Sequence, residues 1–351
     1  MNTARSIVIA GLWCGVAVWS TGCASALLAP RIVTGPAAKE ARQGFSNAAP
    51  EARVALARTY AHDLRVPVAG SPPVEIAVGV IEPGNYQLDY TVNTRTVDGS
   101  QPRYSVNIYW EPLAADAPKP ACKGTVVLLH GFWMNREAVL HWALRLAPAG
   151  YRCVLVDLRG HGSSVAPWVT YGAREVQDMR AVLDDLQQRG LADERVAVLG
   201  ISYGAAVGLQ WAADDVRIAT VVALAPFADP RLAIRQYARA MLSPTANRAV
   251  SDGAIRGGTA RAAKLAGFRW DQVDVLKAVR ALRGPVLFVH GDADQLIPTD
   301  HSRRLVAVAP EGSRLIEVPG DDHFAISMRL AGIQDEVQAW LDAHLGAAER
   351  P

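Results

Sequence analysis

The sequence predicts an α/β protein with a mostly parallel central sheet flanked by helices. From Gly124 onward, short apolar runs of strand length alternate with longer stretches that repeat apolar residues at helical spacing. Within that series, the glycine-rich turn Gly200–Gly204 joins an apolar run to a run of small residues, as expected where a helix packs closely on a sheet.

The composition is that of a globular protein with a sizeable core. The chain has 351 residues, of which 50% are hydrophobic and 20% are charged. A formal net charge of +2 gives no overall preference for polyanions, so we expect no nucleic-acid partner. The sequence contains no H-E-x-x-H, no paired C-x-x-C and no phosphate-binding G-x-x-x-x-G-K-[ST] motif, so we expect no metal and no cofactor.

The first residues have the pattern of an export signal. An uncharged, mostly apolar run of 13 residues, Ile7–Trp19, is too short to span a bilayer comfortably. Small residues then precede Cys23 and resemble a bacterial lipobox, in which the cysteine is lipidated. We therefore expect a lipoprotein-like signal peptide over residues 1–23, a membrane anchor at Cys23 and a place in the cell envelope facing the periplasm. The alternative is ordinary secretion, with cleavage near Ala24 or Ala26.

Two segments precede the predicted parallel sheet. Residues 24–73 are rich in Ala, Arg and Pro, and we interpret them as a tether and N-terminal extension. Residues 74–351 are expected to form one domain. Tyr86–Val92 and Tyr104–Trp110 alternate apolar and polar residues, which predicts an antiparallel strand pair on a sheet edge.

The elements of the domain follow in order. Apolar runs predict strands at 125–129, 195–199, 286–289 and 315–318, and apolar residues at helical spacing predict a helix over 173–188.

Ser202 is the candidate nucleophile. It lies in G-x-S-x-G between the strand 195–199 and the helical run 205–213, which is the context of a nucleophile elbow. A serine hydroxyl needs a base, and the base needs an orienting acid. Asp294 follows one downstream strand and His323 follows the next, so the chain order is Ser202, Asp294, His323.

An oxyanion hole is also required, because negative charge develops on the substrate carbonyl oxygen in the transition state. The strand 125–129 ends in His-Gly, and the backbone amides of Phe132 and Tyr203 are the candidate donors.

These motifs resemble the α/β-hydrolase family from about Cys122 to about Leu345, and within it the branch of dienelactone-hydrolase-like and prolyl-oligopeptidase-like serine hydrolases. The matching segments are VVLLHGF (126–132), VLVDLRGHGSS (154–164), RVAVLGISYG (195–204), VVALAPF (221–227), VLFVHGDADQLIP (286–298) and GDDHF (320–324). The chain departs from many members at Ala205, which replaces a glycine, and its nucleophile is a serine where true dienelactone hydrolases have a cysteine.

The resemblance implies roles for further residues. It favours Asp294, the last residue of G-x-x-D, over Asp292 as the acid. It implies structural roles for His130 and His161, and we interpret His290 as a core residue at the end of a buried strand.

The resemblance also implies a cap over the site at about residues 231–283, formed by a few short helices. This segment contains eleven Lys and Arg residues and three Asp residues, a formal charge of +8. The charge indicates either solvated helix faces or attraction of an anionic substrate or lipid surface. Cys122 and Cys153 precede strands expected to be neighbours; we expect two buried free thiols, and a disulfide is the open alternative.

Together these features predict a serine hydrolase that cleaves carboxylic esters through an acyl-enzyme. Two alternatives stay open: a serine peptidase acting on short peptides, and a non-catalytic envelope binding protein on a hydrolase scaffold. The complete set Ser202, Asp294 and His323 argues against the second alternative.

Overall fold

The computed structural model describes residues 21–35, 59–70, 74–95, 103–112, 118–242 and 244–345. Most of the predicted signal peptide lies outside these residues and stays a prediction. No helix in the described part of the chain is long and apolar enough to cross a membrane.

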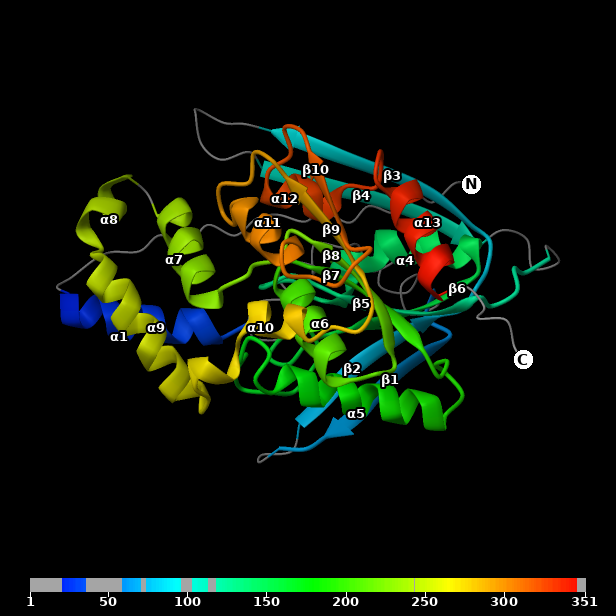
Figure 1. The fold of residues 1–351 in the computed structure, drawn as a ribbon, viewed down its shortest axis with the longest axis horizontal. Coiled ribbons are helices and arrows are strands. Elements are labelled where there is room, and N and C mark those ends of the chain that lie inside the picture. Colours follow the sequence, from blue (N-terminus) through cyan, green and yellow to red (C-terminus); the bar gives the residue numbers. More distant parts are fainter. Residues whose placement is uncertain are drawn as a thin grey trace.

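An eight-stranded sheet forms the centre of the molecule (Figure 1). The strand order is β1-β2-β6-β5-β7-β8-β9-β10; the β1–β2 and β2–β6 pairs are antiparallel, and all other pairs are parallel. The strands are β1 (His62–Val68), β2 (Val74–Ile81), β5 (Gly124–Leu129), β6 (Tyr151–Val156), β7 (Val196–Ile201), β8 (Ile218–Leu224), β9 (Val286–Gly291) and β10 (Arg314–Val318). The predicted mostly parallel sheet is confirmed.

Helices cover both faces of the sheet. Side chains of β5 alternate between two hydrophobic clusters, with Val127 and Leu129 in one and Val126 and Leu128 in the other. The first cluster includes residues of α5 (Glu175–Gln188), α6 (Tyr203–Asp214), α10 (Val275–Arg280) and α11 (Asp300–Val306). The second includes residues of α4 (Leu140–Leu146), α12 (His323–Met328) and α13 (Gln334–Leu345). Short 3-10 turns are η1 (Arg136–Val139), η2 (Ala147–Ala149) and η3 (Trp270–Gln272). The helix predicted over 173–188 is present as α5.

The two alternating segments form a separate ribbon. β3 (Tyr86–Arg95) and β4 (Arg103–Pro112) pair antiparallel, as predicted, but in a two-stranded sheet of their own. The prediction that they lie on the edge of the main sheet is wrong, because β1 and β10 occupy its edges. The apolar residues of the ribbon pack against the α4 side of the molecule, where Ile108 and Trp110 are buried.

The segment interpreted as a tether contains regular structure that packs on the domain. β1 pairs along its whole length with β2, so the main sheet begins before residue 74. α1 (Thr21–Val33) packs along α9 (Asp252–Ala266), and Ala29, Ile32 and Val33 are buried in the first hydrophobic cluster. Within residues 24–73, the described parts, 24–35 and 59–70, therefore include a helix and a strand that pack on the domain.

Short helices occupy the segment expected to be the cap. They are α7 (Pro230–Met241), α8 (Pro244–Ala249), α9 and α10. Of these, α10 packs on α6 and so belongs to the helix layer on the sheet, whereas α7, α8 and α9 project from one end of the molecule (Figure 1). Cys122 and Cys153 are both free thiols; Cys153 is buried, but Cys122 is exposed, contrary to expectation.

Candidate active site

The backbone at Ser202 is held in an uncommon conformation. β7 ends at Ile201 and α6 begins at Tyr203, so the chain turns sharply at Ser202, where φ is 51° and ψ is −108°. Non-glycine residues avoid positive φ because Cβ crowds the backbone, at a cost of about 1–3 kcal/mol. The Ser202 amide donates to the Leu224 carbonyl at 2.7 Å, which ties the turn to the end of β8.

Neighbouring backbone lies so close to both glycines of the G-x-S-x-G motif that no side chain fits at either position. A Cβ on Gly204 would lie 2.4 Å from the Leu129 carbonyl oxygen, and one on Gly200 would lie 2.6 Å from the Cα of Ala205. Any side chain at either position would push α6 away from the sheet, so the motif follows from the close approach of α6 to β5 and β7.

Three predicted site residues come together at this turn. His323 Nε2 lies 2.9 Å from Ser202 Oγ, and His323 Nδ1 lies 2.6 Å from Asp294 Oδ2. The exposed fractions of the residues are 9% for Ser202, 6% for His323 and 4% for Asp294, so little water reaches them. With Nδ1–H donated to the carboxylate, Nε2 presents a lone pair to the serine hydroxyl.

The Asp294 carboxylate is held in place from several sides. Its Oδ1 accepts the amides of Leu296 at 2.9 Å and Ile297 at 2.8 Å. Burial by itself raises the pKa of Asp294, but the charge of His323 and the hydrogen bonds from His290, His323 and Ile297 outweigh it and hold the pKa well below its ordinary value. The carboxylate is therefore ionised at neutral pH.

His290 supports the acid, a contact that the interpretation as a core residue did not include. Its Nε2 lies 3.2 Å from Asp294 Oδ2 and 2.8 Å from the Ile297 carbonyl, both of which are acceptors. Nε2 must therefore carry the proton, and Nδ1 accepts the hydroxyl of Ser302 at 2.7 Å. The spacing His290–Asp294 across a strand end was the one sequence signal for this contact.

The other nearby acids are engaged elsewhere. Asp292 is exposed, and its Oδ1 accepts the Gly320 amide at 2.7 Å, so it orders the loop before the histidine. Asp321 forms an ion pair with Arg329. Of the two candidate acids, only Asp294 contacts His323.

Phe132 and Tyr203, the candidate oxyanion donors, lie side by side, with ring centroids 5.9 Å apart. Neither backbone amide donates a hydrogen bond to another residue in the described part of the chain. Tyr203 is also the first residue of α6, where the helix leaves its amides unsatisfied and partially positive. Both amides are therefore available for the role of oxyanion donors, which stays a prediction.

Two neutral histidines fix the loop that carries Phe132. His130 Nε2 accepts the Leu158 amide at 3.0 Å, and His161 Nε2 accepts the Trp133 amide at 3.3 Å. Burial lowers the pKa of His130 to about 4 and that of His161 to about 3, so both rings are neutral at physiological pH and can accept. These contacts agree with the structural roles that the resemblance implied.

A buried carboxylate anchors the second donor residue. The hydroxyl of Tyr203 donates to Glu175 at 2.8 Å, and Glu175 also accepts the amides of Thr170 at 2.6 Å and Gly172 at 2.7 Å. This arrangement holds the Tyr203 side chain and with it the start of α6. Nothing in the local sequence indicates it, because the partners belong to different elements.

The β3–β4 ribbon reaches the segment that carries His323. The Tyr104 hydroxyl donates to Asp322 Oδ2 at 2.7 Å. Asp322 in turn caps α12 by accepting the amides of Phe324 at 3.0 Å and Ala325 at 2.8 Å. Because His323 is the first residue of α12, this contact joins the ribbon to the helix end that carries the histidine.

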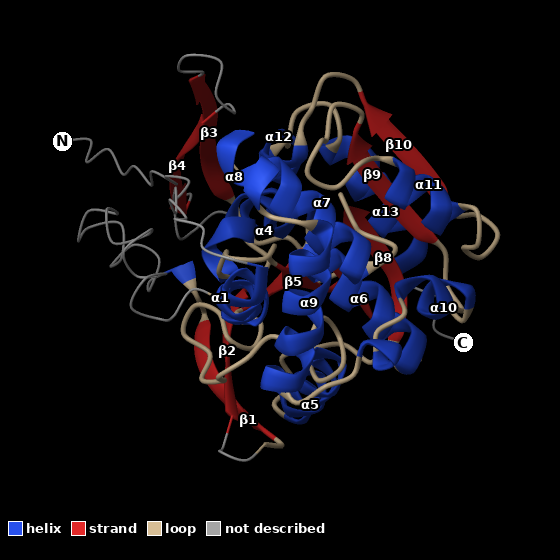
Figure 2. Cartoon of the chain, turned by 90° about the vertical axis from the view of Figure 1, so that its left-hand side faces the viewer, coloured by secondary structure: helices blue, strands red, loops and turns tan. Residues whose placement is uncertain are grey.

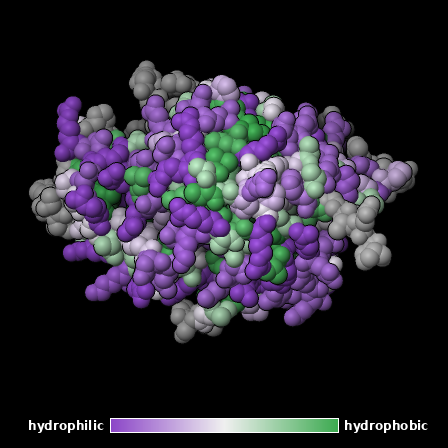
Figure 3. Space-filling view, in the orientation of Figure 1, coloured by the Kyte–Doolittle hydropathy of each residue, from purple (hydrophilic) through white to green (hydrophobic). Residues whose placement is uncertain are grey.

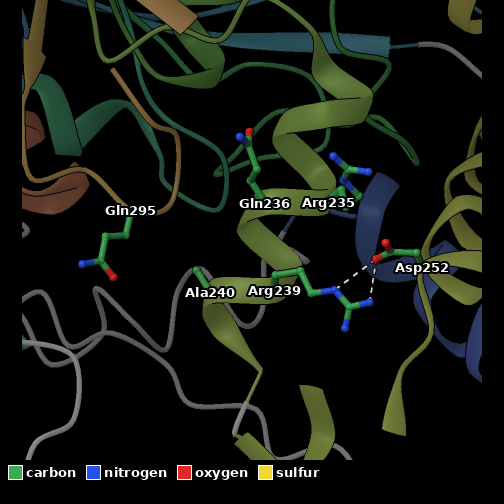
Figure 4. A pocket seen from close by; sticks show the side chains of 6 residues that line it. All are labelled: Arg235, Gln236, Arg239, Ala240, Asp252 and Gln295. Carbon is green, nitrogen blue, oxygen red and sulfur yellow. Dashed lines mark hydrogen bonds and ion pairs between the residues drawn. The ribbon is translucent and has the colours of Figure 1, made fainter. Parts of the chain in front are cut away.

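A cavity of about 480 Å³ lies between α7 and the loop after the acid. Its lining residues are Arg235, Gln236, Arg239, Ala240, Asp252 and Gln295. Figure 4 shows Gln295 across from α7 and Arg239 turned toward Asp252, which it contacts at 2.6 Å. Because Gln295 directly follows Asp294, the cavity adjoins the site without being lined by Ser202 or His323. Among the described residues, no group of three or more His, Cys, Asp or Glu residues could hold a metal ion.

A model of the alpha/beta hydrolase family matches residues 126–331, more than half of the chain. The chain belongs to the alpha/beta hydrolase family. The finer resemblance to the dienelactone-hydrolase-like and prolyl-oligopeptidase-like branch stays a prediction.

Similar proteins include two curated bacterial relatives. YqkD of Bacillus subtilis, an uncharacterised protein, is 27% identical over 187 residues, which cover 52% of this chain and 58% of YqkD, little more than half of its length. The monoacylglycerol lipase of Mycolicibacterium smegmatis is 28% identical over 259 residues, covering 64% of this chain and 89% of the lipase.

Solved structures share the fold. The Pyrococcus furiosus esterase Pf2001 has a TM-score of 0.55 at 18% identity, covering 81% of this chain and 93% of the esterase. An esterase from Thermogutta terrifontis has a TM-score of 0.53 at 16% identity, covering 82% of this chain and 100% of that chain.

Asp294→Asn is expected to lower kcat by about 10⁴, because an amide cannot hold the His323 proton on Nδ1. Asp292→Asn is the matched control and should cost far less, since Asp292 is exposed and its carboxylate accepts the Gly320 amide instead of contacting His323. Steady-state ester hydrolysis by both purified variants measures the difference. The reverse ranking would move the acid to Asp292.

Tyr104→Phe is expected to lower kcat three- to tenfold, about what one lost hydrogen bond of roughly 1 kcal/mol allows, with KM little changed. Tyr90→Phe is the control, because Tyr90 joins the same ribbon to the far end of α12 at the Met328 carbonyl. Steady-state kinetics and thermal midpoints of both variants distinguish an effect on the His323 segment from an effect on the stability of the fold. Equal losses of kcat in the two variants would show that the ribbon acts only by stabilising the fold.

Proposed function

We propose that this protein is a serine hydrolase that cleaves carboxylic esters through an acyl-enzyme intermediate. The observation that carries the proposal is the hydrogen-bonded series Ser202–His323–Asp294, with distances of 2.9 Å and 2.6 Å, at the strained turn of an α/β-hydrolase fold. The curated relative named as a monoacylglycerol lipase supports ester substrates.

In the first half of the reaction, Ser202 Oγ bonds to the ester carbonyl carbon while its proton passes to His323 Nε2. Asp294 holds the proton on Nδ1 and stabilises the imidazolium that forms. The carbonyl oxygen becomes negative and is bound by the amides of Phe132 and Tyr203. The C–O bond to the alcohol then breaks, and the departing oxygen takes the proton from Nε2.

In the second half, water replaces the alcohol. His323 Nε2 removes a proton from the water as its oxygen bonds to the acyl carbon, and the same amides bind the new oxyanion. When the bond to Ser202 breaks, Oγ recovers the proton and the carboxylic acid leaves. The low exposure of all three residues favours this step, because charge interactions are stronger where little water is present.

Ser202→Ala is expected to abolish labelling by a fluorophosphonate probe and to lower kcat for simple esters by about 10⁶. His323→Ala should lower kcat by the same factor. The double variant should have a kcat no lower than that of either single variant, because the two residues act as a unit. Ser163→Ala, on the loop after β6, is the control and should label normally. Labelling of the Ser202 variant at the wild-type level would exclude this nucleophile, and faster cleavage of an aminoacyl amide than of esters would indicate a peptidase.

We also propose that the protein is exported and anchored in the bacterial envelope by a lipid on Cys23. The apolar run Ile7–Trp19 and the small residues before Cys23 support this. Cys23 lies in the first turn of α1, so such a lipid would be attached close to the domain instead of at the end of a long tether.

Cys23→Ser is expected to move the protein from the membrane fraction to the soluble fraction without lowering esterase activity in vitro. The mass of the mature N-terminal peptide measures the lipid directly. A mature chain that begins with an unmodified residue at or beyond Ala24 would contradict lipidation and favour ordinary secretion.

A further inference from the structure

The helix α1 is fixed to the cap along its length. Gly257 and Gly258 of α9 allow this approach, because a Cβ on Gly258 would lie 3.0 Å from the Cβ of Leu28 and one on Gly257 would lie 3.4 Å from the Cβ of Ser25. Ser25 is buried at this contact. Figures 1 and 2 show α1 and α9 side by side at the end of the molecule that carries α8.

The other end of α1 is tied to the body of the domain. The Tyr171 hydroxyl donates to the Ile32 carbonyl at 2.6 Å, and the Val169 amide donates to the Val33 carbonyl at 2.8 Å. Together with its packing along α9, these two hydrogen bonds hold α1 against the domain.

The exposed residues of the two helices follow helical spacing and combine basic and apolar side chains. We call the exposed basic residues and leucines of the two helices the α1–α9 face: Leu27, Arg31, Arg256, Arg261, Lys264 and Leu265. The other exposed residues of the two helices are Ala26, Pro30, Asp252, Gly253 and Ala260. Leu27 is 50% exposed and Leu265 is 43% exposed, so each leaves a large part of its apolar side chain in water. In the space-filling view, hydrophilic side chains dominate this end of the molecule, with apolar patches between them (Figure 3).

The charge on this face is unbalanced. α1 and α9 together contain four basic residues and one acidic residue, Asp252, whose carboxylate is paired with Arg239 of α7 at 2.6 Å. None of the four basic side chains forms an ion pair within the described residues. Some of the other exposed arginines do, for example Arg303 with Glu317 at 2.6 Å.

We propose that the α1–α9 face binds the surface of an anionic phospholipid bilayer. Lys and Arg place charged ends among lipid phosphates while their stems cover apolar surface, and exposed leucines enter the boundary between head groups and acyl chains. A bilayer surface offers both charged phosphates and apolar acyl chains, which matches a face that combines basic residues with leucines. The backbone of a nucleic acid offers a uniform row of charges and matches such a face less well.

Such binding would place the cap next to the bilayer. Asp252, the first residue of α9, also lines the 480 Å³ cavity beside the acid loop. The binding itself does not depend on the proposed esterase activity.

The test uses the full chain carrying Cys23→Ser, so that no attached lipid contributes, and vesicles of phosphatidylcholine with or without phosphatidylglycerol. The test variant is Arg256→Gln with Arg261→Gln and Lys264→Gln. The matched control is Lys277→Gln with Arg280→Gln and Arg283→Gln, which removes the same charge from exposed positions in and just after α10. Flotation measures the partition coefficient of each protein, and the ratio between the two lipid compositions isolates the contribution of charge.

Each basic residue near an anionic surface strengthens binding about fivefold, so the test variant should lose about 100-fold of its preference for phosphatidylglycerol. The control should keep that preference. Replacing Arg256 and Arg261 by Lys should also keep it, and thermal midpoints verify that all variants fold.

Three results would overturn the proposal: equal losses in the test and control triples, no loss in either, or wild-type binding to duplex DNA as tight as to phosphatidylglycerol vesicles. The first result would show that binding depends on the net charge of the protein and not on this face. The last would indicate a site that binds polyanions in general. Fluorophosphonate labelling of Ser202 in the same samples reports the esterase proposal separately.

Discussion

The strained backbone at Ser202 is the constraint on which the rest of the site depends. A nucleophile at the top of the sheet requires the chain to pass from β7 to α6 without an intervening loop. That turn brings α6 so close to the sheet that a Cβ on Gly208 would lie 2.8 Å from Val198 Cγ1. The strain is maintained because β7 lies between two parallel neighbours and is buried throughout.

Around this turn, buried polar groups are paired with one another, which keeps the site rigid. Arg159 binds Asp178 through two hydrogen bonds of 2.6 Å and 2.7 Å, and both side chains are almost wholly buried. Burial raises the pKa of Asp178 to about 6 even though Arg159 opposes the shift. Such pairs stabilise little in themselves, but removing one partner leaves an uncompensated charge in the core. They therefore favour one arrangement of the loops beside Ser202.

Two elements outside the central sheet extend the hydrolase domain toward the site. The β3–β4 ribbon contacts the cap of α12 through Tyr104, and α1 joins α9 to the loop that carries Tyr171. Each connects a surface element to a segment of the site. In this protein, the parts outside the main sheet thus contact the residue before the histidine and a helix that lines the cavity.

The sequence by itself determined the elements with local signals: the nucleophile turn, the helix α5, the parallel strands, and the order Ser202, Asp294, His323. Periodicity and glycine placement record the turn, the helix and the strands because each depends on residues close together in the chain. The order of the three site residues follows from the resemblance to the α/β-hydrolase family. Only the tertiary structure decided that His290 supports Asp294 and that Glu175 anchors Tyr203. It also decided that β1 joins the main sheet, that the ribbon stands apart from it, and that α1 packs on α9. These contacts join residues far apart in the chain or depend on how elements pack, and a one-dimensional pattern carries no record of either.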